Sequence, residues 1–335
     1  MTSLKPPGLK PGDTIGFFSP SSAATVWVPQ RFARARAFLE AQGFRLKAGS
    51  LTGQQDHWRS GSIAARAAEL NALIRDPEVR CIMSVIGGSN SNSLLPYLDY
   101  EALKRDPKII IGYSDVTALL LGIYAKTGLV TFYGPALVAS FGELPPLVDE
   151  TLSGFRQICQ AGGTVPHTLP TPAQWTDERL DWENQTRAKQ CLPNRLISVG
   201  SGKVRGRLIG GNLNTLAGIW GSPYMPAIQQ GDILLLEDSL LSAETVERSF
   251  AHLKLCGVFD RIGALVLGKH ELFNQQGSGK RPLDILLEVV GEPAFPILAE
   301  YDCAHTHPML TLPLGIEAEL DLDAQSLTLC EPWLR

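Results

Sequence analysis

The stretch that decides the fold is KIIIGYSDVTALL, residues 108–120, because it joins an apolar run to a helical pattern. Ile109–Ile111 is a β-branched run, typical of a strand covered on both faces, and Gly112 allows a tight exit from it. The helical pattern that follows has apolar residues at i, i+3, i+4 and i+7, namely Val116, Leu119, Leu120 and Ile123. Gly128 stands where a left-handed residue would end this helix. We therefore expect Ser114 at the start of a helix that follows a buried strand.

This position suits Ser114 to chemistry as well as to helix capping. Free N–H groups and the dipole at a helix start favour developing negative charge, so the Ser114 hydroxyl is a candidate nucleophile and the Asp115 N–H a candidate donor to an oxyanion. Serine is also a common N-cap residue, and such a cap needs no catalytic role. The local pattern leaves both interpretations open.

Length and composition are those of an ordinary two-domain enzyme. The chain has 335 residues, 44% of them apolar, which is enough for two separate cores. The net charge of −4 and the isoelectric point near 5.9 argue against a nucleic-acid partner, which would require a basic face. The apolar run Ile15–Phe18 is too short for a signal peptide, and no stretch approaches the roughly 20 apolar residues of a membrane span. We expect a cytoplasmic protein with no membrane partner.

The six cysteines are scattered without a C-x-x-C pair. They indicate neither a disulfide framework nor a structural zinc site, and we expect them to be reduced and mostly buried.

The first 140 or so residues alternate strand and helix patterns, as in a parallel sheet flanked by helices. We expect strands over 14–19, 79–86 and 108–111, and helices over 30–42 and 66–75. The Gly87-Gly88 turn and Ser114 both follow the carboxyl ends of strands, where open α/β sheets place their ligands, so we expect them to face one crevice.

Residues 142–205 are rich in proline and lack periodicity, which indicates a connection with a long loop. Trp175 and Trp182 favour a functional loop over a disordered linker, since linkers are poor in aromatic residues. Beyond it we expect a smaller, β-rich region with strands over 232–237, 262–267, 318–322 and 326–329 and a helix over 243–256. The predicted division is an α/β domain over 1–165, a connecting loop over 166–205 and a β-rich domain over 206–335.

A nucleophilic serine needs a base and a group that orients the base. His305 and His307 stand in the segment 302–308, just before the strand-like segment 310–315. Glu237 ends the apolar strand 233–236, where a carboxylate is costly to desolvate without a partner. On local pattern alone, each histidine also fits an ordinary loop, and Glu237 also fits a strand end that meets solvent.

The motif blocks resemble the LD-carboxypeptidase family of serine peptidases, in the order Ser, Glu, His. The three central blocks are Gly112–Leu119, Leu236–Asp238 and Ala304–Pro308. Further blocks spread over nearly the whole chain: Gly12-Asp13, Ser19–Ser22, Gly87-Gly88, Tyr133–Pro135, Gly210–Leu213 and Leu312–Gly315.

The resemblance implies a Rossmann-like or flavodoxin-like domain that carries the nucleophile and a β-rich domain that carries Glu and His. It implies a Ser114–His305–Glu237 triad, an oxyanion hole from N–H groups near Gly88 and Asp115, no cofactor or metal, and a homodimer. The family usually has glycine before its catalytic histidine, whereas this chain has Ala304, which leaves His307 open as the base.

Two subgroups of this family differ in substrate. One removes the terminal D-alanine of muropeptides, and the other resembles the microcin C self-immunity peptidase, which cleaves an aminoacyl or peptidyl amide to a nucleotide. The Gly-Ser-Asn run at 87–93 and the Trp segment at 175–187 are similar to the second subgroup, whose substrate is a small peptide or aminoacyl-nucleotide. A Gly-Trp pair expected after Asn194 is replaced by Arg195-Leu196. The substrate-binding residues we expect are Gly87, Ser89, Asn90, Trp182 and Asn212, with Trp182 either stacking on a base or pinning the loop.

Two interpretations of other classes stay open. A metal-dependent hydrolase would use His305 and His307, whose i, i+2 spacing places both rings on one face of a strand, with Asp302 or Cys303 nearby. A non-enzymatic nucleotide-binding module would use the Gly87-Gly88 turn, although no P-loop or G-x-G-x-x-G fingerprint follows a strand.

Overall fold

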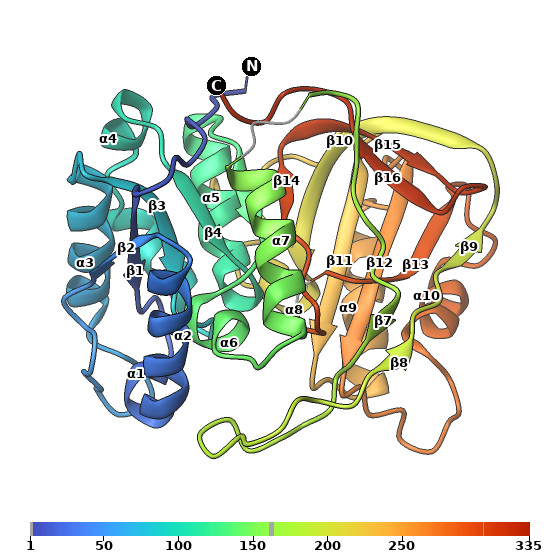
Figure 1. The fold of residues 1–335 in the computed structure, drawn as a ribbon. Coiled ribbons are helices and arrows are strands. Elements are labelled where there is room, and N and C mark those ends of the chain that lie inside the picture. The colour runs from blue at the N-terminus through green and yellow to red at the C-terminus, as the bar shows by residue number, and fades with distance from the viewer. Residues whose placement is uncertain (1–2, 161–163, 304) are drawn as a thin grey trace.

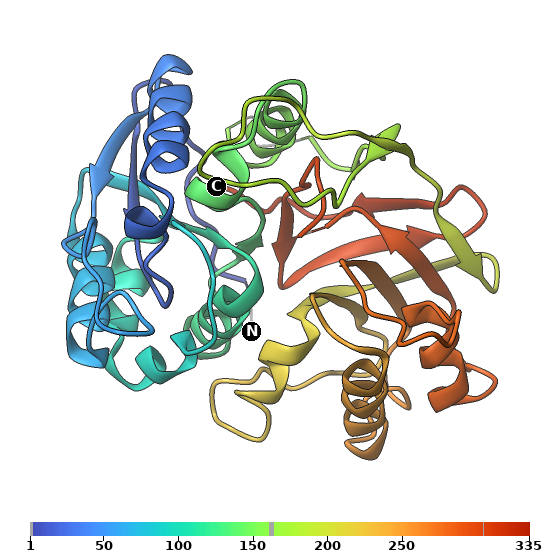
Figure 2. The same ribbon diagram turned by 90° about the horizontal axis from the view of Figure 1, so that it is seen from below.

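The structure is a computed structural model that describes residues 3–160, 164–303 and 305–335. Two β-sheets lie beside each other, each with its own helices (Figures 1 and 2). The first sheet has six strands in the order β14-β5-β4-β3-β1-β2, and the second has eight in the order β6-β16-β15-β10-β11-β12-β13-β9. The predicted fold class, a parallel α/β sheet followed by a β-rich region, is confirmed.

The first sheet is parallel except at one edge. Its strands are β1 (Thr14–Phe18), β2 (Arg45–Ala48), β3 (Val79–Ser84), β4 (Ile109–Gly112), β5 (Thr131–Tyr133) and β14 (Leu312–Leu314), of which β14 pairs antiparallel with β5. The helices of this half are α1 (Ala24–Trp27), α2 (Pro29–Ala41), α3 (Ile63–Arg75), α4 (Tyr100–Arg105), α5 (Thr117–Thr127), α6 (Leu137–Phe141) and α7 (Leu147–Cys159), with 3-10 turns at Ser91–Tyr97 and Ser114–Val116. The β-branched run of β4 is fully buried, as its composition predicts.

The second sheet is mixed. Its strands are β6 (His167–Thr168), β9 (Ile197–Val199), β10 (Lys203–Asn212), β11 (Ile233–Ser239), β12 (Ala264–Glu271), β13 (Ile297–Tyr301), β15 (Ile316–Asp321) and β16 (Ser326–Leu329), with helices α8 (Leu213–Ala217), α9 (Ala243–Leu255) and α10 (Pro282–Val290). Strands β10 to β13 run parallel, so the carboxyl end of β11 meets the same edge as the end of β10. The three strands over 232–237, 318–322 and 326–329 and the helix over 243–256 lie where they were predicted, and the strand expected over 262–267 begins and ends slightly later.

The expectation of an aperiodic segment over 142–205 is wrong in its first part. Helix α7 occupies Leu147–Cys159 and buries apolar side chains on one face. Pro145-Pro146 stands directly before it, and proline is well tolerated in the first turn of a helix. Farther along, β7 (Gln174–Trp175) and β8 (Leu192–Pro193) form a two-stranded ribbon. The β7–β8 loop, residues 176–191, is therefore a closed loop on a ribbon.

The limits predicted for the domains stay a prediction, and three strands cross them. β14 comes late in the chain yet joins the first sheet, while β6 and β9 come from the predicted connection yet join the second. The two sheets are thus tied together by chain that passes between them.

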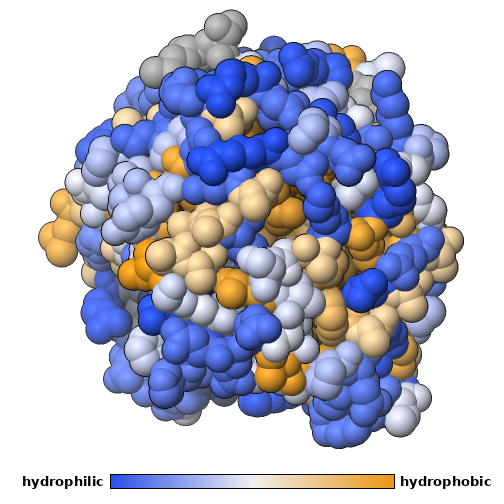
Figure 3. Space-filling view, turned by 90° about the vertical axis from the view of Figure 1, so that its left-hand side faces the viewer, coloured by the Kyte–Doolittle hydropathy of each residue, from blue (hydrophilic) through white to orange (hydrophobic). Residues whose placement is uncertain are grey.

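The face of the first half is mainly hydrophilic, with hydrophobic residues gathered in its middle (Figure 3). Helix α3, on this side of the molecule, exposes alanines at 64, 68 and 72. Among the described helices, none is long and apolar enough to cross a membrane. The six cysteines are free; Cys81, Cys159 and Cys303 are buried and the other three half-buried.

Candidate active site

Ser114 stands between β4 and α5 in a strained backbone conformation. Its φ is +61°, in the left-handed region that residues with a side chain seldom adopt. It opens the 3-10 turn that leads into α5, and α5 ends at Gly128 with φ +71°, as predicted. Strained residues of this kind cluster at functional sites, where surrounding structure holds them in place.

The Gly87-Gly88 turn lies directly against Ser114. A Cβ atom at Gly87 would stand 2.9 Å from Ser114 Cβ, 3.1 Å from its Oγ and 3.2 Å from the Asp115 amide nitrogen. Gly88 has φ +148°, and a Cβ there would stand 2.2 Å from Ser21 Oγ. The Gly87-Gly88 turn and Ser114 thus lie together at the strand ends, and they can approach so closely because both glycine positions lack a side chain.

Glu237 and His305 form a hydrogen-bonded pair, in which Glu237 is fully buried and His305 is mostly buried. The Nδ1 atom of His305 lies 2.7 Å from Oε2 of Glu237, and the Glu237 side chain is fully buried. Oε1 of Glu237 accepts hydrogen bonds from the Tyr133 hydroxyl and, at 3.1 Å, from the Asn212 amide. The edge of the His305 ring packs on Tyr113, with 4.9 Å between ring centroids. Glu237 does not meet solvent, so that alternative is wrong.

The charges of this pair are mutually stabilised. Burial by itself would lower the pKa of His305, but the charge and the hydrogen bond of Glu237 outweigh it and raise that pKa to about 9. Burial likewise tends to raise the pKa of Glu237, and the charge of His305 together with three hydrogen bonds holds it below its usual value. Glu237 thus stays ionised and orients the imidazole through Nδ1.

Tyr133 links the pair to Ser114. The Ser114 amide donates to the Tyr133 hydroxyl over 3.3 Å, and that hydroxyl donates to Glu237. The tyrosine ring is buried in β5. Tyr133 begins the family block Tyr133–Pro135, which by itself assigns it no role. The signal for a role is a tyrosine in a short apolar strand, since a buried tyrosine hydroxyl usually needs a partner.

His307 lies in a different environment from His305. It is buried, its backbone forms a bridge with Thr176, and burial lowers its pKa to about 3. Its Nδ1 has no hydrogen-bond partner among the residues that the structure describes. The predicted strand with both rings on one face is wrong, because this segment is a bend followed by a single bridge. Within residues 3–160, 164–303 and 305–335, no group of three His, Cys, Asp or Glu side chains could hold a metal ion. The question about Ala304 lies outside the described residues.

Two of the predicted substrate-binding residues already have partners in the protein. Asn90 Oδ1 accepts from Arg66 at 2.6 Å and from Ser21 at 3.1 Å. Asn212 caps α8 through Thr215 and donates to Glu237 and Asp238. Both residues therefore shape the site, and their contact with substrate stays a prediction. Gly88 and Ser89 are exposed to solvent.

Trp182 lies on the β7–β8 loop and covers Arg31, whose guanidinium carbon is 4.4 Å from the ring centroid. The ring is half-buried and lines a cavity of about 540 Å³. Lys189 and Glu271 line the same cavity, and Glu271 contributes to the raised pKa of His305. Trp175 lies instead in β7, with the Lys269 ammonium 5.1 Å from its ring centroid.

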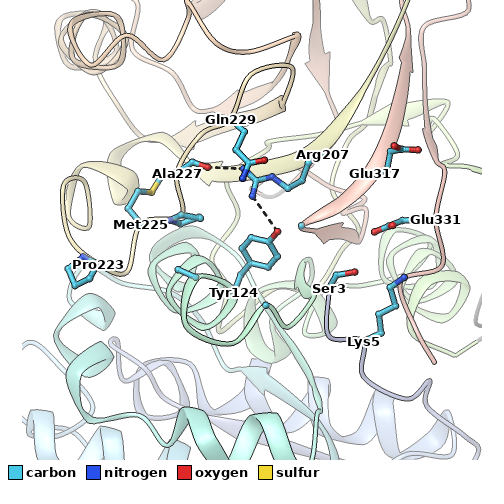
Figure 4. Close-up of a pocket in the computed structure, with 14 residues that line it drawn as sticks. Ser3, Lys5, Tyr124, Arg207, Pro223, Met225, Ala227, Gln229, Glu317 and Glu331 are labelled. Carbon is cyan, nitrogen blue, oxygen red and sulfur yellow. Dashed lines mark hydrogen bonds between the residues drawn. The ribbon is translucent and has the colours of Figure 1, made fainter. Parts of the chain in front are cut away.

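A larger cavity of about 760 Å³ lies elsewhere, at the seam between the two halves (Figure 4). It contains none of the predicted site residues. The Arg207 guanidinium in its wall donates hydrogen bonds to the Tyr124 hydroxyl, the Ala227 carbonyl and the Asp232 carboxylate. Because Tyr124 belongs to the first half and Arg207 to the second, these bonds stabilise the contact between the halves.

Two family models match this chain. Residues 15–134 match the LD-carboxypeptidase N-terminal domain, and residues 205–320 match the LD-carboxypeptidase C-terminal domain. The chain belongs to the LD-carboxypeptidase family. As a member of this peptidase family it is a hydrolase.

Relatives within the LD-carboxypeptidase family cover nearly the whole chain. A putative carboxypeptidase of Vibrio cholerae is 62% identical over 97% of both chains. The microcin C7 self-immunity protein MccF of Escherichia coli is 55% identical over 96% of this chain and 94% of its own length. The structure of MccF in complex with aspartyl sulfamoyl adenosine superposes with a TM-score of 0.98 at 54% identity, over 99% of this chain and all of the other.

Proposed function

We propose that this LD-carboxypeptidase-family protein is a serine amide hydrolase that cleaves the amide between an aminoacyl or peptidyl carboxyl group and a nucleotide. The observation that carries the proposal is the structural likeness, over nearly the full length of this chain, to MccF in complex with aspartyl sulfamoyl adenosine. Such a ligand has the acyl group, the amide-like link and the base that this substrate class requires. In this proposal the reacting carbonyl lies at Ser114 and the base lies in the cavity that Trp182 lines.

The proposed chemistry is acyl transfer through a Ser114–His305–Glu237 triad. His305, held by Glu237 through Nδ1, takes the proton of the Ser114 hydroxyl on its other ring nitrogen as Oγ attacks the carbonyl carbon. The tetrahedral intermediate collapses, the C–N bond breaks and His305 gives its proton to the leaving amide nitrogen. Water then attacks the ester on Ser114 with His305 again as base, which releases the acid and restores the hydroxyl.

The proposed oxyanion hole consists of the Gly88 and Asp115 amides. Asp115 is the second residue of a helical turn, and the first amides of a helix lack acceptors inside the helix. The buried Asp115 side chain fixes the Gly88–Ser91 segment, since its Oδ2 accepts from the amides of Asn90 at 3.1 Å and Ser91 at 2.9 Å. Donors fixed in this way need no reorganisation when negative charge develops.

The subunit arrangement and compartment belong to the same proposal. We expect a homodimer in the cytoplasm. The proposed serine chemistry needs neither a cofactor nor a metal.

Hydrolysis of two substrates side by side tests the proposal. Purified protein is given an aminoacyl sulfamoyl adenosine and, separately, a murein tetrapeptide, each with and without a chelator. We expect release of the amino acid from the nucleotide conjugate, unchanged by the chelator. Release of D-alanine from the tetrapeptide with no cleavage of the conjugate would overturn the substrate assignment, and loss of activity with the chelator would overturn the serine mechanism.

A further inference from the structure

The β7–β8 loop crosses from the second half of the molecule to the first (Figures 1 and 2). At its stem, Asp177 accepts from the Leu272 amide at 3.1 Å, and Thr176 exchanges backbone hydrogen bonds of 2.9 and 3.0 Å with His307. Near its tip, the Glu183 carboxylate accepts from the Gln30 amide at the start of α2, 3.0 Å away. The loop is thus held both at its stem and near its tip.

A buried charged cluster joins this loop to the first half. Its centre is Glu143, just after α6, whose side chain is fully buried. Glu143 pairs with Arg31 of α2 at 3.2 Å and with Lys189 of the loop at 3.7 Å, and it also accepts from the Gln185 amide of the loop. Arg31 in turn donates to Gln185 at 2.8 Å and lies under the ring of Trp182.

Glu143 is the carboxylate that pairs with both buried cations of the cluster, and the charge of Glu271 acts on Lys189 more weakly. Arg31 and Lys189 are both almost completely buried, with side chains 0% and 3% exposed, and they come from separate elements. Burial tends to raise the pKa of Glu143, but the charges of Arg31 and Lys189 and a hydrogen bond from the Leu144 amide outweigh it and hold that pKa below its usual value, so the carboxylate is charged at neutral pH. Removing one partner of a buried pair leaves the other charge uncompensated, and the loop can escape this by leaving the surface.

The remaining contacts of the loop tip are weaker. The Glu183 contact to Gln30 is exposed to solvent, and the ion pair of Arg187 with Glu178 lies within the loop itself. Exposed contacts of this kind contribute little, because solvent screens them. The stability of the docked loop therefore rests mainly on Glu143.

We propose that Glu143 is a positioning residue that keeps the β7–β8 loop docked on Arg31, and so holds Trp182 at the cavity and Thr176 against His307, two residues from His305. The effect on turnover rests on the proposed function, whereas the docking does not. No contact of Glu143 with substrate is needed.

Limited trypsin digestion tests the docking without any substrate. Arg179 and Arg187 are exposed within the loop, and cleavage there requires the loop to open. We expect Glu143→Gln to be cut after Arg179 at least tenfold faster than wild type. Glu69→Gln is the matched control, because Glu69 is equally buried but, among the residues that the structure describes, accepts only from the Ser19 and Leu51 amides. The control should be cut at the wild-type rate.

A second variant keeps the test decisive if Glu143→Gln fails to fold. Lys189→Gln removes the partner on the loop and should also speed cleavage after Arg179, while adding it to Glu143→Gln should have little further effect, because the two residues act as a pair. Equal cleavage rates in wild type and in whichever of these variants folds, as confirmed by its melting transition, would overturn the proposal.

Steady-state kinetics then measures the consequence for the reaction. On an aminoacyl sulfamoyl adenosine, Glu143→Gln should raise KM about tenfold and lower kcat much less, as expected when a binding loop is released. An unchanged KM with a fast-cut loop would overturn the link between docking and binding. If wild type itself does not cleave the conjugate, the proposed function fails, while the digestion result still decides the docking.

Discussion

Glu237 brings a negative charge into the interior at the end of an apolar strand, and three side chains offset the cost. His305, Tyr133 and Asn212 each bind one of its oxygens. The family resemblance implies the first partner, whereas the local pattern indicates only that a desolvated carboxylate needs a cation or donors. It does not predict Tyr133, which is 104 residues away and meets Glu237 only after the two sheets have come together.

The pH dependence of the reaction should report the Glu237–His305 pair. His305 must be neutral to act as a base, so kcat/KM of the free enzyme should rise with pH until about 9, where His305 loses its proton. In Glu237→Gln this rise should move to below about pH 7, because the raising charge is gone and burial remains, and kcat should fall. A rise at the same pH in both proteins would show that His305 is not the titrating base.

The same pair gives a prediction for stability. The pKa of His305 in the folded protein, about 9, lies above its value near 6.5 in the unfolded chain. The stabilisation is therefore complete below pH 6.5 and is lost as the pH rises from 6.5 through 9. The melting temperature of wild type should fall over this interval, and that of His305→Ala should fall less. Parallel curves for the two proteins would contradict the assignment.

Tyr133→Phe should separate positioning from packing. The change removes only the hydroxyl that joins the Ser114 amide to Glu237. A hydrogen bond to a charged group is worth roughly 1.5–3 kcal/mol, so we expect kcat/KM to fall roughly tenfold or more, with the fold retained. Activity equal to wild type would show that the hydroxyl plays no part in aligning the site.

At the scale of elements, the glycine turn at 87–88 gives two substitutions with different results. Gly87→Ala places a methyl group 2.9 Å from Ser114 Cβ and 3.1 Å from its Oγ, so it must displace Ser114 and should abolish most activity with a modest fall in the melting temperature. Gly88→Ala meets both a positive φ and Ser21, so it should lower the melting temperature more. Near-normal turnover by Gly87→Ala would contradict the position given to the reacting carbonyl.

The β7–β8 loop gives a prediction through Trp182. If the ring stacks on the base, Trp182→Ala loses roughly 1–3 kcal/mol, which is a five- to 150-fold fall in kcat/KM for nucleotide conjugates. A base-free amide should be nearly unaffected. Because the ring also covers Arg31, an equal loss on both substrates would instead assign Trp182 to docking of the loop alone.

Element prediction from this sequence succeeds where burial is uniform and fails where partners are distant. β4 and α5 follow from a β-branched run and a helical repeat with a glycine end. α7 has an uninterrupted helical repeat of buried residues, including Val148, Leu152, Phe155 and Cys159, which only the proline-rich sequence around it obscures. The β7–β8 ribbon does not follow from the sequence, because a two-residue strand such as β7 has no periodicity to detect. The cluster at Glu143 joins residues 42 to 154 positions apart, a relation that no local pattern contains.

At the scale of the whole molecule, catalysis is proposed to occur where the two sheets meet. Ser114 comes from the first sheet, Glu237 from the second, and β14 returns to the first sheet soon after His305. The sequence indicates both halves and the order of the motifs. The sequence does not indicate that β14 pairs with β5 in the first sheet, because Leu312–Leu314 predicts a strand but not the strand with which it pairs.

The most direct measurement is turnover of an aminoacyl sulfamoyl adenosine by Ser114→Ala. Removing a triad serine lowers kcat by a factor on the order of 10⁶, so activity should fall to near background while the melting temperature stays close to that of wild type. The wild type should also form an acyl-enzyme on the peptide that contains Ser114, detected by mass spectrometry after a rapid quench, and the variant should not. Activity of Ser114→Ala within tenfold of wild type would contradict the account.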